Sequence, residues 1–129
     1  MVQIPESHRD ILDSKSFAHV ATVDADGTPQ VTPVWVEFDG EYISINSAKG
    51  RKKDRNMVGR PQVAVSIQDP ADPYRYLGIQ GRVVEFTTEG AVEQIHRLSR
   101  KYTGKNFGDL GNATRVTYKI EPEKVWVNG

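Results

Sequence analysis

The chain has 129 residues, 17 basic and 17 acidic side chains, and no cysteine, so its formal net charge is zero. This length predicts one domain over residues 1–129 with a hydrophobic core of its own. Zero net charge argues against a dedicated nucleic-acid-binding protein, and the lack of cysteine excludes thiol nucleophiles, disulfide scaffolds and Cys-based metal sites.

The N-terminal part of the chain is predicted to form a short helix and three strands. Residues 5–15 suit a helix because Pro5 fits the first turn. Three segments that alternate apolar and polar residues are predicted strands: 17–23, 29–38 and 41–46. The Asp-Gly pairs at 26–27 and 39–40 are tight-turn signals. These strands are therefore expected to form a meander.

The rest of the chain is predicted to contain two helices and four further strands. One helix covers residues 50–59, and the other runs from a cap at Thr87 or Thr88 to about Tyr102. The second helix has an apolar stripe that is expected to face inward: Val92, Ile95, Leu98 and Tyr102. The four predicted strands are 62–68, 74–86, 114–120 and 124–127, the last two separated by Pro122.

Glycine and proline positions refine these elements. Gly78 and Gly81 lie within the long strand, where a bulge, a bend or a close ligand is expected. Residues 69–73 form a turn-rich loop with two prolines, and residues 101–111 form a loop expected to be mobile.

Strands do not alternate regularly with helices, which excludes a doubly wound α/β fold. The pattern predicts a mainly β protein, a small barrel of six to seven mostly antiparallel strands with peripheral helices.

The chain lacks the usual signals of export and membrane insertion. No stretch approaches the roughly 20 apolar residues that span a membrane as a helix. The first residues have neither the basic start nor the apolar run of a signal peptide. Together with the lack of cysteine, these features suit a cytoplasmic protein.

Basic side chains are concentrated in one stretch, Ser47 to Met57 and its immediate continuation. Six of the 17 basic residues fall here, with Asp54 as the one acid among them: Lys49, Arg51, Lys52, Lys53, Arg55 and Arg60. A strand end that leads through Ser and Gly into a helix also directs free backbone N–H groups toward one spot. The stretch therefore predicts a pocket for a phosphate-bearing ligand, although such basic runs are often solvated helix faces.

Three segments resemble the pyridoxamine 5′-phosphate oxidase-like split-barrel superfamily. They are Phe17–Trp35, the pair Lys53–Met57 and Pro61–Val65, and Tyr76–Glu85. The second resembles the branch whose members bind the deazaflavin coenzyme F420. No single motif is diagnostic, but their order and spacing match over nearly the whole chain.

The resemblance implies a homodimer with two cofactor sites in the clefts between the barrels. It places the phosphate-bearing tail of the cofactor against Lys53, Arg55 and Asn56, with Lys49 and Arg51 just ahead of them. It places the ring system against the strand Thr32, Pro33, Val34 and Trp35, with Ser47 at a neighbouring strand end. Further contacts are expected from a segment of the partner subunit and from an aromatic residue of the closing strand: Tyr74, Arg75, Tyr76 and Trp126.

The function implied is an F420-dependent oxidoreductase that transfers a hydride between reduced F420 and an electron-poor small molecule. The hydride chemistry belongs to the cofactor, which agrees with the lack of a catalytic triad, paired carboxylates or metal-ligand spacing. The three histidines, His8, His19 and His96, are too widely spaced to suggest a metal site. Two alternatives stay open: an FMN-binding oxidase or reductase of the same fold, and a non-catalytic F420- or flavin-binding protein. The sequence selects neither a substrate nor a proton donor.

Overall fold

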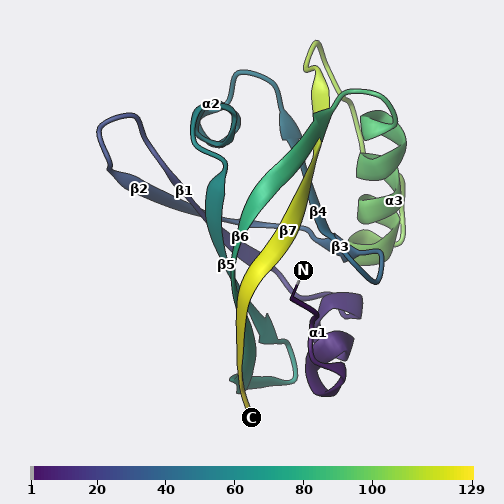
Figure 1. Cartoon of the computed structure of the whole chain (residues 1–129). Coiled ribbons are helices and arrows are strands. Elements are labelled where there is room, and N and C mark those ends of the chain that lie inside the picture. The colour runs from purple at the N-terminus through teal and green to yellow at the C-terminus, as the bar shows by residue number, and fades with distance from the viewer. Residues whose placement is uncertain (1) are drawn as a thin grey trace.

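Figure 1 shows the computed structural model of the chain, which describes residues 2–129. These residues form four helices: η1 (Glu6–His8), α1 (Arg9–Asp13), α2 (Lys52–Gly59) and α3 (Ala91–Thr103). They also form seven strands: β1 (Ala18–Val23), β2 (Pro29–Val34), β3 (Glu37–Phe38), β4 (Ile43–Ala48), β5 (Gln62–Asp69), β6 (Asp72–Thr87) and β7 (Arg115–Asn128).

The strands build one antiparallel sheet in the order β2-β1-β5-β6-β7-β4-β3. The sheet curls into a half-barrel, with α3 along one side, α2 near one end and α1 near the other (Figure 1). Inside the curl lies a core whose largest members include Ile45, Ile67, Leu77 and Tyr118, all with 0% exposure. The predicted mainly β split barrel with peripheral helices is confirmed.

The strand predicted over residues 29–38 is in fact two strands. β2 pairs with β1 and β3 pairs with β4, and these pairs lie at opposite edges of the sheet. Trp35 and Val36 carry the chain from one edge to the other. Val36 is fully buried, so the alternation of apolar and polar residues continues through the crossing. The sequence therefore reads as one continuous strand. The predicted three-stranded meander is therefore wrong, because β1–β2 and β3–β4 are separate hairpins.

The two strands predicted around Pro122 are one continuous strand, β7. The pairing of β6 with β7 shifts register between Gln80 and Gly81 and again between Val83 and Glu85, so bulges absorb the proline without ending the strand. A Cβ at Gly81 would collide with the Glu121 carbonyl oxygen. The bulge expected at this glycine is therefore confirmed, and the reason is close backbone approach.

Helix α3 begins later than predicted, and only part of its predicted inward stripe is buried. Its N-cap is Gly90, whose φ of 78° lies in the left-handed region, so the predicted threonine cap is wrong. Val92 is 42% exposed, which contradicts its place in the predicted inward stripe. Ile95 and Leu98 of the predicted stripe are buried as expected, and the other buried positions of the helix are Ala91, Gln94 and Ser99.

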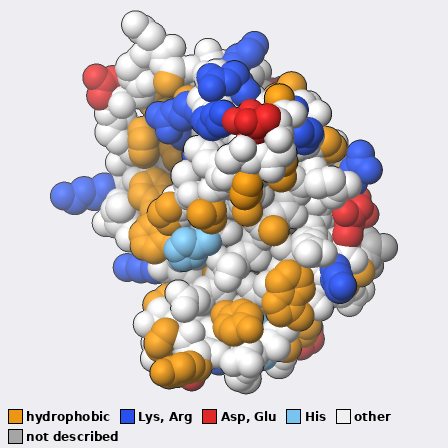
Figure 2. Space-filling view, turned by 90° about the vertical axis from the view of Figure 1, so that its left-hand side faces the viewer, with side chains coloured by type: hydrophobic (Ala, Val, Ile, Leu, Met, Phe, Trp, Pro, Cys, Tyr) orange, Lys and Arg blue, Asp and Glu red, His pale blue; other side chains and the backbone are white. Residues whose placement is uncertain are grey.

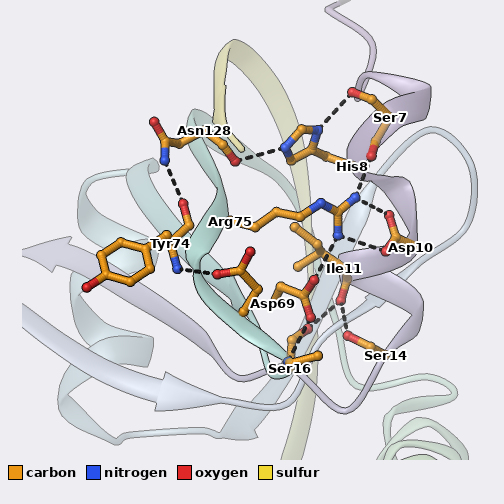
Figure 3. A network of polar contacts seen from close by, with 12 residues as sticks. Ser7, His8, Asp10, Ile11, Ser14, Ser16, Asp69, Tyr74, Arg75 and Asn128 are labelled. Carbon is orange, nitrogen blue, oxygen red and sulfur yellow. Dashed lines mark hydrogen bonds and ion pairs between the residues drawn. The ribbon is translucent and has the colours of Figure 1, made fainter.

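A polar network joins the N-terminal helices to the β5–β6 hairpin (Figure 3). Arg75 donates to both carboxylate oxygens of Asp10, at 2.8 and 2.7 Å, and to Asp69 at 2.9 Å. Asp69 pairs with Asp72, so the loop expected over residues 69–73 is a tight turn.

None of the helices formed by residues 2–129 has the length and apolar character needed to cross a membrane.

Candidate functional site

The basic stretch begins where β4 ends and turns into α2. Asp54, its one acid, is 7% exposed and accepts hydrogen bonds from the backbone N–H of Gly50, at 2.8 Å, and from the Tyr118 hydroxyl. Burial, reinforced by this carboxylate, holds the pKa of Tyr118 well above its usual value. The acid therefore ties the turn to the core, and the basic side chains are left on the outside.

Several basic side chains of the stretch have partners within the chain. Lys52 forms an ion pair with Asp24, Arg60 donates to the Val23 carbonyl at 2.7 Å, and Arg55 donates to the Gly50 carbonyl at 2.6 Å. Lys49 is exposed.

Asn56, which the resemblance assigned to the cofactor tail, is 2% exposed. Its amide donates to Thr22 Oγ1 at 3.0 Å, which holds α2 against β1.

Arg51 and Lys53 instead line a cleft of about 280 Å³. The cleft lies between the N-terminus of α2, the end of β2 and the inner side of α3. Its lining combines aromatic and aliphatic side chains with three cations: Phe17, Pro33, Val34, Trp35, Asn46, Arg51, Lys53, Ile95, Leu98, Phe107 and Arg115. Among the described residues, no carboxylate contributes to this lining.

Trp35 is held in the wall of the cleft by other rings. It stacks on Tyr102 with ring centroids 5.4 Å apart and an interplanar angle of 15°. The ring of Phe107 meets it edge-on at 6.2 Å. An indole fixed in this way gives the cleft a flat apolar surface against which a planar ring can pack.

Burial and neighbouring positive charge lower the pKa values of two cations of the cleft. Partial burial, then the nearby charges of Arg51 and Arg115, lower the pKa of Lys53. Burial and the charge of Arg51 likewise lower the pKa of Arg115. No ion pair within residues 2–129 neutralises any of the three. A bound anion would relieve both the repulsion and the desolvation, so the cleft is suited to an anionic ligand.

Arg115 was not among the residues that the sequence singled out. It opens β7 and pairs with Ala48 at the end of β4, directly beside the basic stretch. The sequence contains the signal that a strand begins near this arginine. Its neighbourhood depends on the pairing of β4 with β7, which no local pattern reveals.

Two predicted residues are not part of the cleft lining. Ser47 follows the cleft residue Asn46, so its side chain points to the other face of the sheet, and Thr32 lies just before the cleft residues Pro33 and Val34. Both hydroxyl oxygens are buried without a hydrogen-bond partner among the described residues. A cofactor contact from either residue stays a prediction.

The last group of predicted residues lies at the end of the barrel that is opposite α2. Tyr74 and Arg75 follow the β5–β6 turn, and Trp126 precedes the C-terminus, whereas α2 lies at the opposite end of the barrel (Figure 1). Arg75 is engaged with Asp10 and Asp69. The indole of Trp126 packs over Gly78, where a Cβ would collide with it. Contact of this end with a cofactor therefore requires a second subunit.

Comparison with known proteins places the chain in a family. The family profile described as pyridoxamine 5′-phosphate oxidase matches residues 4–129. The chain belongs to this pyridoxamine 5′-phosphate oxidase family. Its members share a flavin- and F420-binding fold. No curated protein matches the sequence.

Several solved structures share the fold of this family member. An F420 reductase is 32% identical, with a TM-score of 0.86, and the match covers 95% of this chain and 98% of the reductase. A conserved hypothetical protein from Mycobacterium tuberculosis is 23% identical, with a TM-score of 0.76 and coverage of 97% and 84%. HupZ from Group A Streptococcus is 22% identical, with a TM-score of 0.71 and coverage of 96% and 93%. The last two likenesses concern the fold alone.

The residues of the cleft fit a phosphate-bearing flavin-type group. Three cations without carboxylate partners match an anionic tail, and Trp35 beside Phe107 offers a surface for a fused ring. The volume of about 280 Å³ is at the small end of the range for ligand pockets, about 300–1,000 Å³. The cleft of one chain is therefore small for a whole cofactor of this type.

Proposed function

We propose that the protein is an F420-dependent oxidoreductase, which transfers a hydride between reduced coenzyme F420 and an electron-poor small molecule. The observation that carries the proposal is the set of three unneutralised cations, Arg51, Lys53 and Arg115, in a cleft walled by Trp35. The 32% identity to an F420 reductase over nearly the full length of both chains supports the choice of cofactor.

Each part of the site has a distinct task in this proposal. Arg51 and Lys53 bind the phosphate of the cofactor, Arg with paired N–H groups and Lys as a point charge. The exposed Lys49 and Arg55 lie further out, where the polyglutamate of F420 extends. Asn56 acts indirectly, because the hydrogen bond from its side chain to Thr22 sets the position of α2.

The ring of the cofactor is assigned to the strand end formed by residues 32–35, with Ser47 at the neighbouring strand. When bound, the deazaflavin supplies the hydride-carrying carbon. Trp35 orients the ring, and the apolar side chains of Ile95, Leu98 and Phe107 exclude water from one side of it.

We propose further that the single domain acts as a homodimer. The cleft of one chain is small, and the other predicted contacts lie at the opposite end of the barrel: Tyr74, Arg75, Tyr76 and Trp126. In a dimer these residues of one subunit complete the site of the other.

The proposal is tested by titrating the purified protein with F420 and with FMN. We expect F420 to bind with micromolar or tighter affinity and FMN much more weakly. Lys53→Ala is expected to weaken F420 binding by about 1–3 kcal/mol, the range for a charge-assisted hydrogen bond. The control is Arg82→Ala, an exposed position on β6 outside the cleft.

Three outcomes separate the alternatives. Tighter binding of FMN, or a flavin that copurifies, would replace the proposal with a flavin-dependent oxidase or reductase. If reduced F420 binds but no acceptor in a broad screen oxidises it, the protein is a non-catalytic carrier. Unchanged binding in Lys53→Ala would remove the phosphate assignment.

A further inference from the structure

Arg115 combines deep burial with an unused hydrogen-bonding surface. The residue is 8% exposed, and its guanidinium lies 5.5 Å from the ring centroid of Phe107. Its Nε donates to Asn46 Oδ1 at 2.8 Å. Within residues 2–129, neither Nη atom of Arg115 makes a hydrogen bond, and neither is among the buried polar atoms that lack a partner. Both Nη atoms are therefore open to solvent at the cleft.

A chain of amide groups fixes the direction of this guanidinium. The Asn46 amide donates to the Ala91 carbonyl at 2.8 Å and to Gln94 Oε1 at 2.9 Å. Thr117 Oγ1 donates to the same Gln94 oxygen at 2.7 Å. Since these acceptors claim the NH₂ group of Asn46, its oxygen must face Arg115. The position of Nε is thereby determined by α3 and β7 together.

The hydrogen-bond partner of Arg115 is the uncharged amide of Asn46, so the positive charge of the guanidinium is not neutralised. A carboxylate at position 46 would neutralise the guanidinium, whereas an amide oxygen accepts the hydrogen bond and adds no charge. The chain of amide groups continues as a relay from Gln94, whose Nε2 donates to Glu37 at 3.5 Å. This acid is itself paired with Arg97 at 2.9 Å. A mostly buried, unpaired cation is costly to fold, so the arrangement points to a ligand that supplies the missing negative charge.

We propose that Arg115 is the residue that selects phosphate-bearing cofactors. Its Nη face binds the phosphate that F420 and FMN both carry at the end of the ribityl chain. Asn46 and Gln94 are positioning residues, which act through the guanidinium and do not touch the ligand. This inference deepens the proposed function and rests on its assignment of the cleft to a flavin-type cofactor.

The experiment compares matched ligands with and without the phosphate. Dissociation constants are measured for F420 and for its deazaflavin nucleoside, which lacks phosphate, and likewise for FMN and riboflavin. Arg115→Met is expected to weaken binding of the phosphate-bearing member about 10- to 100-fold and of the phosphate-free member less than about threefold. Arg115→Lys, which keeps a charge but loses the fork of donors, is expected to lie between. Arg82→Met, at an exposed site outside the cleft, should match the unaltered protein.

The two ligand pairs keep this inference separate from the choice of cofactor. If the unaltered protein prefers FMN, the F420 proposal fails, and the FMN–riboflavin pair still decides the role of Arg115. Equal weakening of both members of the bound pair, or no weakening of either, would overturn the inference. Retention of the full phosphate preference in Arg115→Met would overturn it as well, because Arg51 and Lys53 would then account for the preference without Arg115.

The relay is tested through a double-mutant cycle. Asn46→Ala keeps the charge of Arg115 but frees the guanidinium, and it is expected to weaken binding of the phosphate-bearing ligand about 3- to 10-fold. The double variant Asn46→Ala, Arg115→Met should bind no more weakly than Arg115→Met alone. Additive losses would show that Asn46 acts independently and would overturn its positioning role. All constants are compared at a temperature where each variant is folded, as judged from its thermal unfolding curve.

Discussion

Two adjacent lysines show how one residue of rotation on a helix decides a side chain's role. Lys52 forms an ion pair with Asp24, and this hydrogen bond is the main reason that the pKa of Asp24 is lowered. Lys53, about 100° further around α2, enters the cleft, where burial and two arginines lower its own pKa. The same residue type is thus a structural clamp at one position and a ligand-binding candidate at the next.

The lowered pKa of Lys53 predicts a pH dependence of anion binding. Below its pKa the ammonium is charged and attracts the anion; as the pH rises through that pKa, the charge and the attraction are lost. Because burial moves the transition below the ordinary lysine value of 10.5, affinity for F420 should begin to fall at a lower pH than an ordinary lysine would cause. Dissociation constants measured from neutral pH up to 10.5 provide the test.

Lys53→Arg is the control for this pH dependence, since arginine keeps its charge across the range. Its affinity should stay flat where that of the unaltered protein falls. A parallel decline in both proteins would assign the pH effect to another group.

At the residue scale the sequence predicted where charge gathers but not which charges are free. The clustering of basic residues after a strand end was visible. The engagement of Lys52, Arg55 and Arg60 was not, because it depends on how the end of β1, the turn after it and the turn before α2 lie against the helix. The role of Asp54 as an internal clamp was equally hidden, since it depends on Tyr118 from a strand 64 residues away.

At the scale of elements, the crossing between β2 and β3 poses a backbone problem that α3 solves. A segment that leaves one sheet edge for the other loses its ladder partners, and buried backbone groups require replacements. The Tyr102 hydroxyl accepts from the Val36 N–H at 3.1 Å, and the Lys101 ammonium donates to the Val36 carbonyl at 2.7 Å. Two consecutive residues of α3 therefore satisfy both polar groups of the crossing residue.

The same residues bind the last turn of α1 and the connection from α1 to β1. Lys101 donates to the Leu12 carbonyl at 2.7 Å, and the Tyr102 hydroxyl donates to the Ser16 carbonyl. The end of α3 thus clamps two connections at once, and the ring of Tyr102 forms the support on which Trp35 stacks. The stability of the crossing and the geometry of the cleft therefore both depend on the side chain of Tyr102.

Removal of the Tyr102 hydroxyl should separate these two effects. Tyr102→Phe leaves the Val36 N–H without an acceptor, which is expected to lower the free energy of unfolding by about 1–3 kcal/mol, while the ring still supports Trp35. Tyr102→Leu removes the ring as well and should also shift the fluorescence emission of Trp35, measured in a Trp126→Phe background. Urea unfolding curves give the free energies. A Tyr102→Phe protein as stable as the original would show that the clamp is not needed.

Local signals in the sequence predicted elements well and their neighbours poorly. Gly27 and Gly40, with φ of 90° and 98°, lie in the turns that the Asp-Gly pairs predicted. The long strand, the short basic helix and the late helix were also recognised. The crossing at Trp35 and Val36 was missed because burial on either sheet edge produces the same alternation, and only strand order distinguishes them.

At the scale of the whole molecule, an apolar surface remains exposed on the outer side of the sheet, from β1 and β2 through β5 and β6 to β7. Val31 is 62% exposed, Phe17 51%, Tyr74 81% and Trp126 42%. Figure 2 shows hydrophobic side chains spread over this face, with Lys and Arg side chains gathered above them. Apolar area of this kind on one face is typical of an interface, and the resemblance to homodimeric proteins predicted a second subunit.

The last prediction concerns the link between dimer formation and cofactor binding. Val31 lies on the exposed face of β2 and does not line the cleft, so Val31→Glu should disrupt the interface without touching the site of its own chain. We expect sedimentation to show a dimer for the unaltered protein and a monomer for the variant. The variant should also bind F420 at least about tenfold more weakly, because removal of one subunit's contacts costs about 1.4 kcal/mol or more. Val92→Glu places the same charge at a 42% exposed position on α3 and should remain a dimer with unchanged affinity. A Val31→Glu monomer that binds F420 as tightly as the dimer would mean that each chain holds its cofactor alone, and the role assigned to Tyr74, Arg75 and Tyr76 would then have to be abandoned.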